Sequence, residues 1–189
     1  MATAVRPSSA EIDRAILDAA AEVFAVTGFA GTSVQKVADA VGYSKTGLLH
    51  RFPSKAALYD AVVAEARVVA ADLLDEAAQL PAGLQRTPLL VDLVARYAFA
   101  RPGLLRLLVE SMRPGPADPG RAELESLSLR VVDALAPGEQ DPLRRLRLML
   151  GLNLLAEAVL CHAADPEGLD RQQVQALAVE LATAVLGVS

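Results

Sequence analysis

Residues 32–55 constrain the fold more than any other part of the chain. They read TSVQKVADAVGYSKTGLLHRFPSK, two short helical patterns separated by a glycine. Ser33 and Ser44 each precede a pattern, and a hydroxyl side chain at that position caps a helix N-terminus. By the same signal, Ser9 and Ser54 are expected to begin the helices before and after this stretch. Gly42 follows the first pattern, where glycine readily takes the left-handed conformation that ends a helix, and Pro53 stops the second. The stretch therefore predicts a helix-turn-helix.

The charge of this stretch fits a surface that meets nucleic acid. All three lysines of the chain, Lys36, Lys45 and Lys55, lie within it. With Arg51 and Asp39 they give a local charge of +3, whereas the whole chain carries −5. Phosphate binding needs a local basic patch and not a basic protein. In a helix-turn-helix the second helix enters the DNA major groove, so this helix is the expected reader of sequence.

The motifs of this region also occur, in the same order and spacing, in a known family. They are G-F-A-G-T-S, an apolar helix with V-A-D-A, the turn G-Y-S, L-L-H-R-F and S-K-A-A-L. Over residues 9–65 the chain resembles the DNA-binding domain of TetR-type transcriptional regulators. One position departs from the pattern, because many members carry tyrosine where this chain has Leu49. The resemblance implies an all-α chain of about nine helices, with a three-helix DNA-binding domain and a C-terminal ligand-binding and dimerisation domain.

The residues expected to contact DNA lie in the two helices of the motif and at the start of the next helix. They are Thr32, Ser33, Tyr43, Ser44, Lys45, Thr46, Gly47, Leu49, His50, Arg51 and Lys55. Lys45 can donate to guanine, and the methyl group of Thr46 can meet a thymine methyl. Thr32 and Ser33 lie at a helix N-terminus, which attracts phosphate. Any one of these residues alone is also compatible with an ordinary solvated surface, although DNA contact is the favoured interpretation.

Helical patterns separated by proline and glycine continue to the C-terminus. Apolar residues make up 53% of the chain, and no stretch alternates as a strand does. We expect a disordered arm over residues 1–8, the helix-turn-helix domain over 9–53, a long linking helix over 54–80, and a regulatory and dimerisation domain over 81–189. A helix of that length spans about 40 Å, long enough to connect two domains.

The last two long helices are apolar on more than one face. A helix of this kind needs a second apolar partner, and an identical pair from another copy is the simplest one. Homodimerisation is also what the resemblance implies. The residues expected at this interface are Leu146, Leu150, Leu154, Val174, Leu177, Leu181 and Val185. The alternative is that both helices are buried within one chain.

The C-terminal region is expected to bind a small hydrophobic or amphipathic effector, because the resemblance implies a pocket there and its helices are mostly apolar. Polar residues within these helices are the candidate ligand-binding residues: Arg96, Tyr97, Arg106, Glu110, Met112, Asn153 and Glu157. Asn153 and Glu157 are equally compatible with hydrogen bonds inside the protein or across a dimer. The identity of the effector does not follow from the sequence.

Several other classes of protein are not expected. With one cysteine and two histidines, the chain offers no spacing typical of a metal site, and it has no nucleophile or nucleotide-binding motif. We expect no enzyme, no cofactor and no membrane partner. Cys161 is expected to be a small buried residue. A lone cysteine and the lack of an apolar leader fit the bacterial cytoplasm.

The sequence therefore predicts a dimeric repressor that binds a palindromic operator in double-stranded DNA and is released by a small molecule. Two alternatives stay open. One is a sensor or carrier of small molecules that acts through a protein partner. The other is an activator or DNA binder that responds to no ligand.

Overall fold

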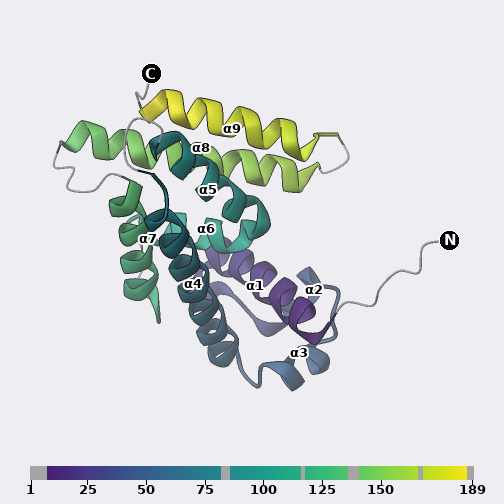
Figure 1. Cartoon of the computed structure of the whole chain (residues 1–189). Helices are drawn as coiled ribbons and strands as arrows, with labels where there is room; N and C mark the ends of the chain where they lie inside the picture. Colours follow the sequence, from purple (N-terminus) through teal and green to yellow (C-terminus); the bar gives the residue numbers. More distant parts are fainter. Residues whose placement is uncertain (1–7, 82–85, 116–117, 136–140, 166–167, 187–189) are drawn as a thin grey trace.

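The computed structural model describes residues 8–81, 86–115, 118–135, 141–165 and 168–186. Within these ranges the chain forms nine helices and no strand, which confirms the predicted all-α fold (Figure 1). The helices are α1 (Ser9–Gly31), α2 (Val34–Ala40), α3 (Lys45–Arg51), α4 (Lys55–Ala78), α5 (Arg86–Ala100), α6 (Pro102–Ser111), α7 (Arg121–Leu135), α8 (Pro142–Ala164) and α9 (Arg171–Leu186). Residues 1–7 of the expected arm lie outside the described residues.

Side-chain hydrogen bonds fix the helix starts near the DNA-binding motif. The three predicted N-caps of α2, α3 and α4 are formed by Ser33, Ser44 and Ser54. The prediction of Ser9 as the cap of α1 was wrong by one residue. Ser8 is the N-cap, and it forms a reciprocal capping box with Glu11. The boundary moved because two adjacent serines carry the same local signal.

The helices of the DNA-binding motif and the C-terminal helix pair lie at opposite ends of the molecule. Figure 1 shows α2 and α3 at one end, the antiparallel pair α8–α9 at the other, and α4 running between them. The closest packing is between α8 and α9 and between α1 and α6. Since α6 belongs to the C-terminal half, α1 is held by a helix from the other half of the chain.

Two main apolar cores follow from this arrangement. The first joins α1–α4 with α6 and α7 and includes Leu104 and Leu124. The second joins the end of α4 with α5, α7, α8 and α9. Helix α4 contributes Leu58 to the first core and Leu73 to the second, so it connects them physically. The division into domains at residues 53 and 80 stays a prediction, and the first core extends beyond it.

By length and composition alone, α8 (Pro142–Ala164) could cross a membrane. It packs against α9, and the core helices of soluble proteins meet the same criterion. The contacts of α8 with α5, α6 and α9 account for the apolar residues on its inner side.

Candidate DNA-binding surface

The apolar faces of α2 and α3 hold the motif against the rest of the first core. Val37, Ala38 and Leu48 are fully buried. Between the helices, Gly42 has a φ of +67°, the left-handed conformation that glycine takes at little cost. With these faces buried, the opposite sides and the N-terminal end of α3 point outward.

The start of α3 is the most accessible part of the predicted surface. Lys45 and Thr46 are exposed, and Lys45 has no hydrogen bond or ion pair with any residue that the structure describes. Gly47 donates its N–H to Ser44 Oγ at 3.0 Å, so the first turn is fixed by its cap. Of the other predicted contacts on this surface, Ser33, Ser44 and His50 are exposed, and Tyr43 and Leu49 are partly buried. A free ammonium group on a rigid helix end can reach a base edge or a phosphate.

Arg51 and Lys55 are already engaged within the chain. The Arg51 guanidinium forms an ion pair with Asp13 of α1. Lys55 Nζ donates to the carbonyl oxygens of Phe29 at 2.8 Å and Thr32 at 3.0 Å, and it lies 4.3 Å from the Phe29 ring centroid. These contacts brace the motif, and the remaining N–H donors of Arg51 and Lys55 are the ones that a DNA contact would use.

Thr32 has a structural position as well. Its side chain is 4% exposed, and its hydroxyl donates to the Gly28 carbonyl at 2.7 Å. The sequence expectation that this side chain is available to phosphate is therefore corrected. Ser33 next to it is exposed and remains a candidate.

A connection between the motif and the C-terminal half was not foreseen from the sequence. Gly28 interrupts α1 with a φ of +67°, and the next N–H, that of Phe29, donates to Asp118 Oδ2 at 3.0 Å. Asp118 lies just before α7. This contact ties the segment that leads into α2 to the connection between α6 and α7.

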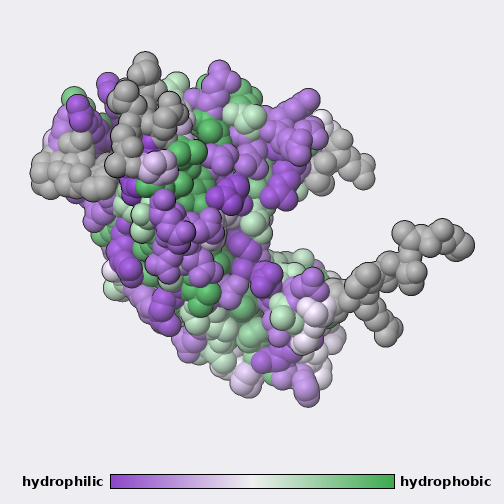
Figure 2. Space-filling view, in the orientation of Figure 1, coloured by the Kyte–Doolittle hydropathy of each residue, from purple (hydrophilic) through white to green (hydrophobic). Residues whose placement is uncertain are grey.

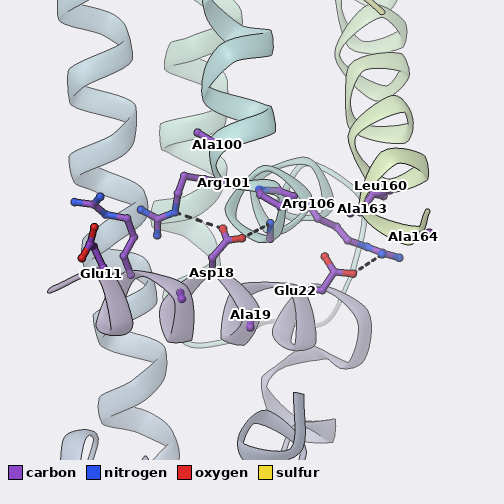
Figure 3. Close-up of a pocket in the computed structure, with 14 residues that line it drawn as sticks. Glu11, Asp18, Ala19, Glu22, Ala100, Arg101, Arg106, Leu160, Ala163 and Ala164 are labelled. Atoms are coloured by element: carbon purple, nitrogen blue, oxygen red, sulfur yellow. Dashed lines mark hydrogen bonds and ion pairs between the residues drawn. The ribbon is translucent and has the colours of Figure 1, made fainter. Parts of the chain in front are cut away.

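A second unforeseen connection involves the middle of α1. The Asp18 carboxylate accepts the N–H groups of Gly103 at 3.2 Å and Leu104 at 3.1 Å, at the start of α6. A carboxylate is favourable at a helix N-terminus. Asp18 also lies 3.5 Å from Arg101 Nε, and Arg101 pairs with Glu65 of α4. One cluster thus joins α1, α4 and α6, and Figure 3 shows its contact between Asp18 and Arg101.

Tyr59 of α4 reports on the packing of this region. It is 3% exposed and meets Phe24 and Phe29 edge-to-face. Burial, and then the Asp118 charge, raise the pKa of Tyr59 to about 12. Because the folded-state pKa is above the ordinary value of about 10, the resulting stabilisation is complete below pH ~10 and is lost as the pH rises toward ~12.

We expect an alkaline absorbance titration to resolve this tyrosine. The chain has no tryptophan, so the difference between the wild type and Tyr59→Phe isolates the Tyr59 phenolate. Its midpoint should lie near 12 in native buffer and near 10 in guanidinium chloride. A native midpoint near 10 would place Tyr59 in water and contradict this packing.

The C-terminal half contains a small apolar cavity between α4, α5, α6, α7 and α8, with a volume of about 70 Å³. Of the predicted ligand-binding residues, Tyr97 and Met112 line it. A separate open cleft of about 730 Å³ lies between α1 and the end of α8. Figure 2 shows the molecule hollowed between its two ends on this side.

The other five predicted ligand-binding residues lie outside the apolar cavity. Arg96 pairs with Glu76 and Asp92 on the surface. Two others lie on α6 and form ion pairs. Arg106 pairs with Glu22 of α1 at 2.6 Å, and Glu110 pairs with Arg113, just after α6, at 2.9 Å. Asn153 and Glu157 lie on α8 and do not line the cavity. The side-chain oxygen of Asn153 accepts a hydrogen bond from Arg113, and its amide nitrogen donates to the Met149 carbonyl oxygen. Glu157 is exposed.

The predicted dimer residues form an outer stripe on α8 and α9. Leu146, Leu150, Leu177 and Leu181 are between 43% and 55% exposed. The other three, Leu154, Val174 and Val185, are half-buried.

Cys161 is exposed on α8, which corrects the expectation that it is buried. Cys161 is two residues beyond the buried Val159, which places it on nearly the opposite side of the helix. In the part of the chain that the structure describes, no group of three or more histidine, cysteine or acidic side chains lies close enough to hold a metal ion.

The comparison with known proteins identifies the region of the motif. The sequence model of the family described as "Bacterial regulatory proteins, tetR family" matches residues 16–62. These residues form a TetR-type DNA-binding domain. The HTH-type transcriptional regulator RutR of Escherichia coli K12 is 52% identical over 50 residues, 26% of this chain and 24% of RutR. The match thus spans about a quarter of the curated relative, and it confirms the resemblance of the TetR-type domain.

Solved structures share the fold over nearly the whole chain. The TetR family regulator PfmR from Thermus thermophilus has a TM-score of 0.58 at 22% identity and covers 91% of this chain and 97% of its own. The fatty acid degradation regulator FadR from Bacillus halodurans has 0.56 at 19% identity, covering 92% and 97%. FadR from Bacillus subtilis, solved with stearoyl-CoA, has 0.52 at 16%, covering 92% and 95%. At these identities the likeness concerns the fold alone.

Proposed function

We propose that this chain is a transcriptional regulator of the bacterial cytoplasm that binds a palindromic operator as a homodimer and is released by a small ligand. The observation that carries the proposal is the free Lys45 at the exposed start of α3, inside a TetR-type domain. Lys45 and Thr46 would read bases, while Ser33, Tyr43 and His50 would meet the sugar-phosphate backbone.

The exposed leucines of α8 and α9 support the homodimer. An isologous interface places the same stripe of each copy against the other, which removes these leucines from water. Leu177 and Leu181 are 55% and 43% exposed on α9, one helical turn apart. A second copy would also place two α3 helices on one side of the assembly, as a palindrome requires.

We expect the double substitution Leu177→Glu and Leu181→Glu to yield a folded monomer. Two carboxylates in the stripe would have to be buried without partners in the dimer, which is costly. Light scattering should give a mass of 19.8 kDa for this variant and twice that for the wild type. Val26→Glu, at a site 58% exposed on α1, is the matched control and should remain dimeric. A wild type that is monomeric at micromolar concentration would contradict the interface.

The contacts of α1 support release by a ligand. Asp18 joins the start of α6, and Asp118 joins the segment before α2, so a shift of α6 would be transmitted to the TetR-type domain. A ligand shifts the population only if it binds the DNA-incompetent state more tightly. The stearoyl-CoA of the Bacillus subtilis neighbour would not fit a cavity of about 70 Å³ without large rearrangement, which favours a smaller effector.

The salt dependence of DNA binding tests this function against a carrier that acts through a protein partner. A regulator that neutralises several phosphates should lose affinity steeply, by about 10³-fold or more between 50 and 200 mM salt. A carrier would show no sequence preference among duplexes at any salt concentration. An activator without a ligand would bind DNA equally well but show no thermal shift with small molecules.

A further inference from the structure

Arg101 is the only buried charged residue in the described part of the chain, with 8% exposure. It stands between α5 and α6 and contacts two other helices. Its Nη1 pairs with Glu65 of α4, and its Nε lies 3.5 Å from Asp18 Oδ1 of α1, as Figure 3 shows for Asp18. Two carboxylates therefore face the single positive charge of the guanidinium, so the cluster carries one excess negative charge.

Part of this guanidinium lacks a hydrogen-bond partner. Nε and Nη2 of Arg101 are buried, and neither donates to an acceptor among the residues described. The Nε contact with Asp18 is close enough for an ion pair, but it does not meet the criteria of a hydrogen bond. Native proteins leave few buried donors unsatisfied, because each has lost its bonds to water.

Arg101 lines both the apolar cavity and the open cleft beside α1. Two other polar side chains on the cavity wall, Tyr97 and Ser128, are satisfied. The Tyr97 hydroxyl donates to Glu76 at 2.6 Å, and the Ser128 hydroxyl lies 2.8 Å from the Leu124 carbonyl oxygen. Among the three polar side chains Tyr97, Arg101 and Ser128, Arg101 is thus the one with buried N–H groups that donate to no acceptor.

We propose that the effector is an uncharged, mainly apolar molecule with one hydrogen-bond acceptor oxygen, which Arg101 binds. This inference rests on the proposed function, because it assumes that the cavity holds the effector. The local charge decides between neutral and ionic ligands. A carboxylate would be a third negative group beside Glu65 and Asp18, and an ammonium group would face the arginine. A carbonyl or ether oxygen satisfies the free donors without either repulsion.

The cavity volume limits the size of the ligand. This volume is the space that the centre of a water-sized sphere can reach, and one water-sized group needs roughly 10–15 Å³ of it. About 70 Å³ therefore accommodates a molecule of about five or six non-hydrogen atoms without movement of the walls. Longer homologues would have to push α6 or α7 outward.

Three probes with equal numbers of non-hydrogen atoms test the proposal: methyl propyl ketone, butyrate and pentylamine. We expect the wild-type chain to bind the ketone at least about tenfold more tightly than either ionic probe, by calorimetry at neutral pH. Arg101→Lys keeps a charge beside Glu65 but removes the second donor edge, so it should weaken ketone binding about tenfold or more. Arg130→Lys changes an exposed arginine of α7 that does not line the cavity, and it should leave ketone binding unchanged.

Tighter binding of butyrate or pentylamine, or equal ketone binding by Arg101→Lys, would overturn the proposal. If Arg101→Lys does not fold, the order of the three probes on the wild type still decides. The Arg101 side-chain N–H signals in NMR spectra should also shift with the ketone alone. Failure of all three probes to bind would refute this inference, whereas specific DNA binding by the same preparation would leave the proposed function standing.

Discussion

Replacing Lys45 with glutamate should weaken binding to the operator by at least about 30-fold. A well-placed contact from a basic side chain to a base is worth about 1–3 kcal/mol, and a dimer makes it twice. The loss is then about 2–6 kcal/mol, and each 1.4 kcal/mol is tenfold in affinity. Because Lys45 is exposed and has no partner among the described residues, its replacement should leave the fold intact.

Arg130→Glu is the matched control for this substitution. Arg130 is exposed on α7, far from α3, and its replacement makes the same change in net charge. Fluorescence anisotropy with a labelled operator duplex, chosen by selection from a random pool, should give near wild-type affinity for Arg130→Glu. Equal affinity of Lys45→Glu and wild type, with helicity preserved, would remove Lys45 from the DNA-binding surface.

Gly103→Ala should destabilise the protein by at least about 2 kcal/mol, because α1 and α6 touch at this glycine. A Cβ atom there would lie 1.9 Å from the Asp18 carbonyl oxygen and 3.1 Å from the Glu22 nitrogen, both backbone atoms. No side-chain rotation can relieve this overlap, so the two helices must separate. For a chain of this size the melting temperature should fall by roughly 4–8 °C.

Gly151→Ala is the control. It replaces a helical glycine where there is room for a methyl group, so it shows how the substitution alone changes stability, without the steric overlap found at Gly103. Gly151 is buried in α8, but a Cβ there would meet its nearest atom at 3.6 Å, an ordinary contact. Alanine favours a helix interior by about 0.5–1 kcal/mol, so this variant should be as stable as the wild type or more so. Similar melting temperatures for Gly103→Ala and the wild type would show that α1 and α6 are less tightly joined than described.

Features encoded by neighbouring residues could be predicted from the sequence. The caps Ser33, Ser44 and Ser54 were correct because each hydroxyl bonds an N–H only three residues away. The exposed start of α3 followed from the same local signals. The TetR-type domain was recognisable because its motif residues are close together in the chain.

Features that depend on distant partners could not be predicted. The hydrogen bonds of Lys55 to the carbonyl oxygens of Phe29 and Thr32 were not foreseen, because they depend on how α1 packs beside α4. Arg106 lines the open cleft, and its ion pair with Glu22, 84 positions away in the chain, was not foreseen. Arg101 carried no local signal, because its burial depends on α1 and α4.

Selection of bound duplexes from a random pool, at near-physiological salt, tests most directly the claim that this chain is a dimeric reader of DNA sequence. We expect an enriched palindrome whose half-site centres lie about one helical turn apart, or a multiple of it, as two α3 helices in successive major grooves require. Lys45→Glu should fail to enrich it. If the wild type enriches no sequence, even after denaturation and refolding to remove bound small molecules, the central claim is contradicted.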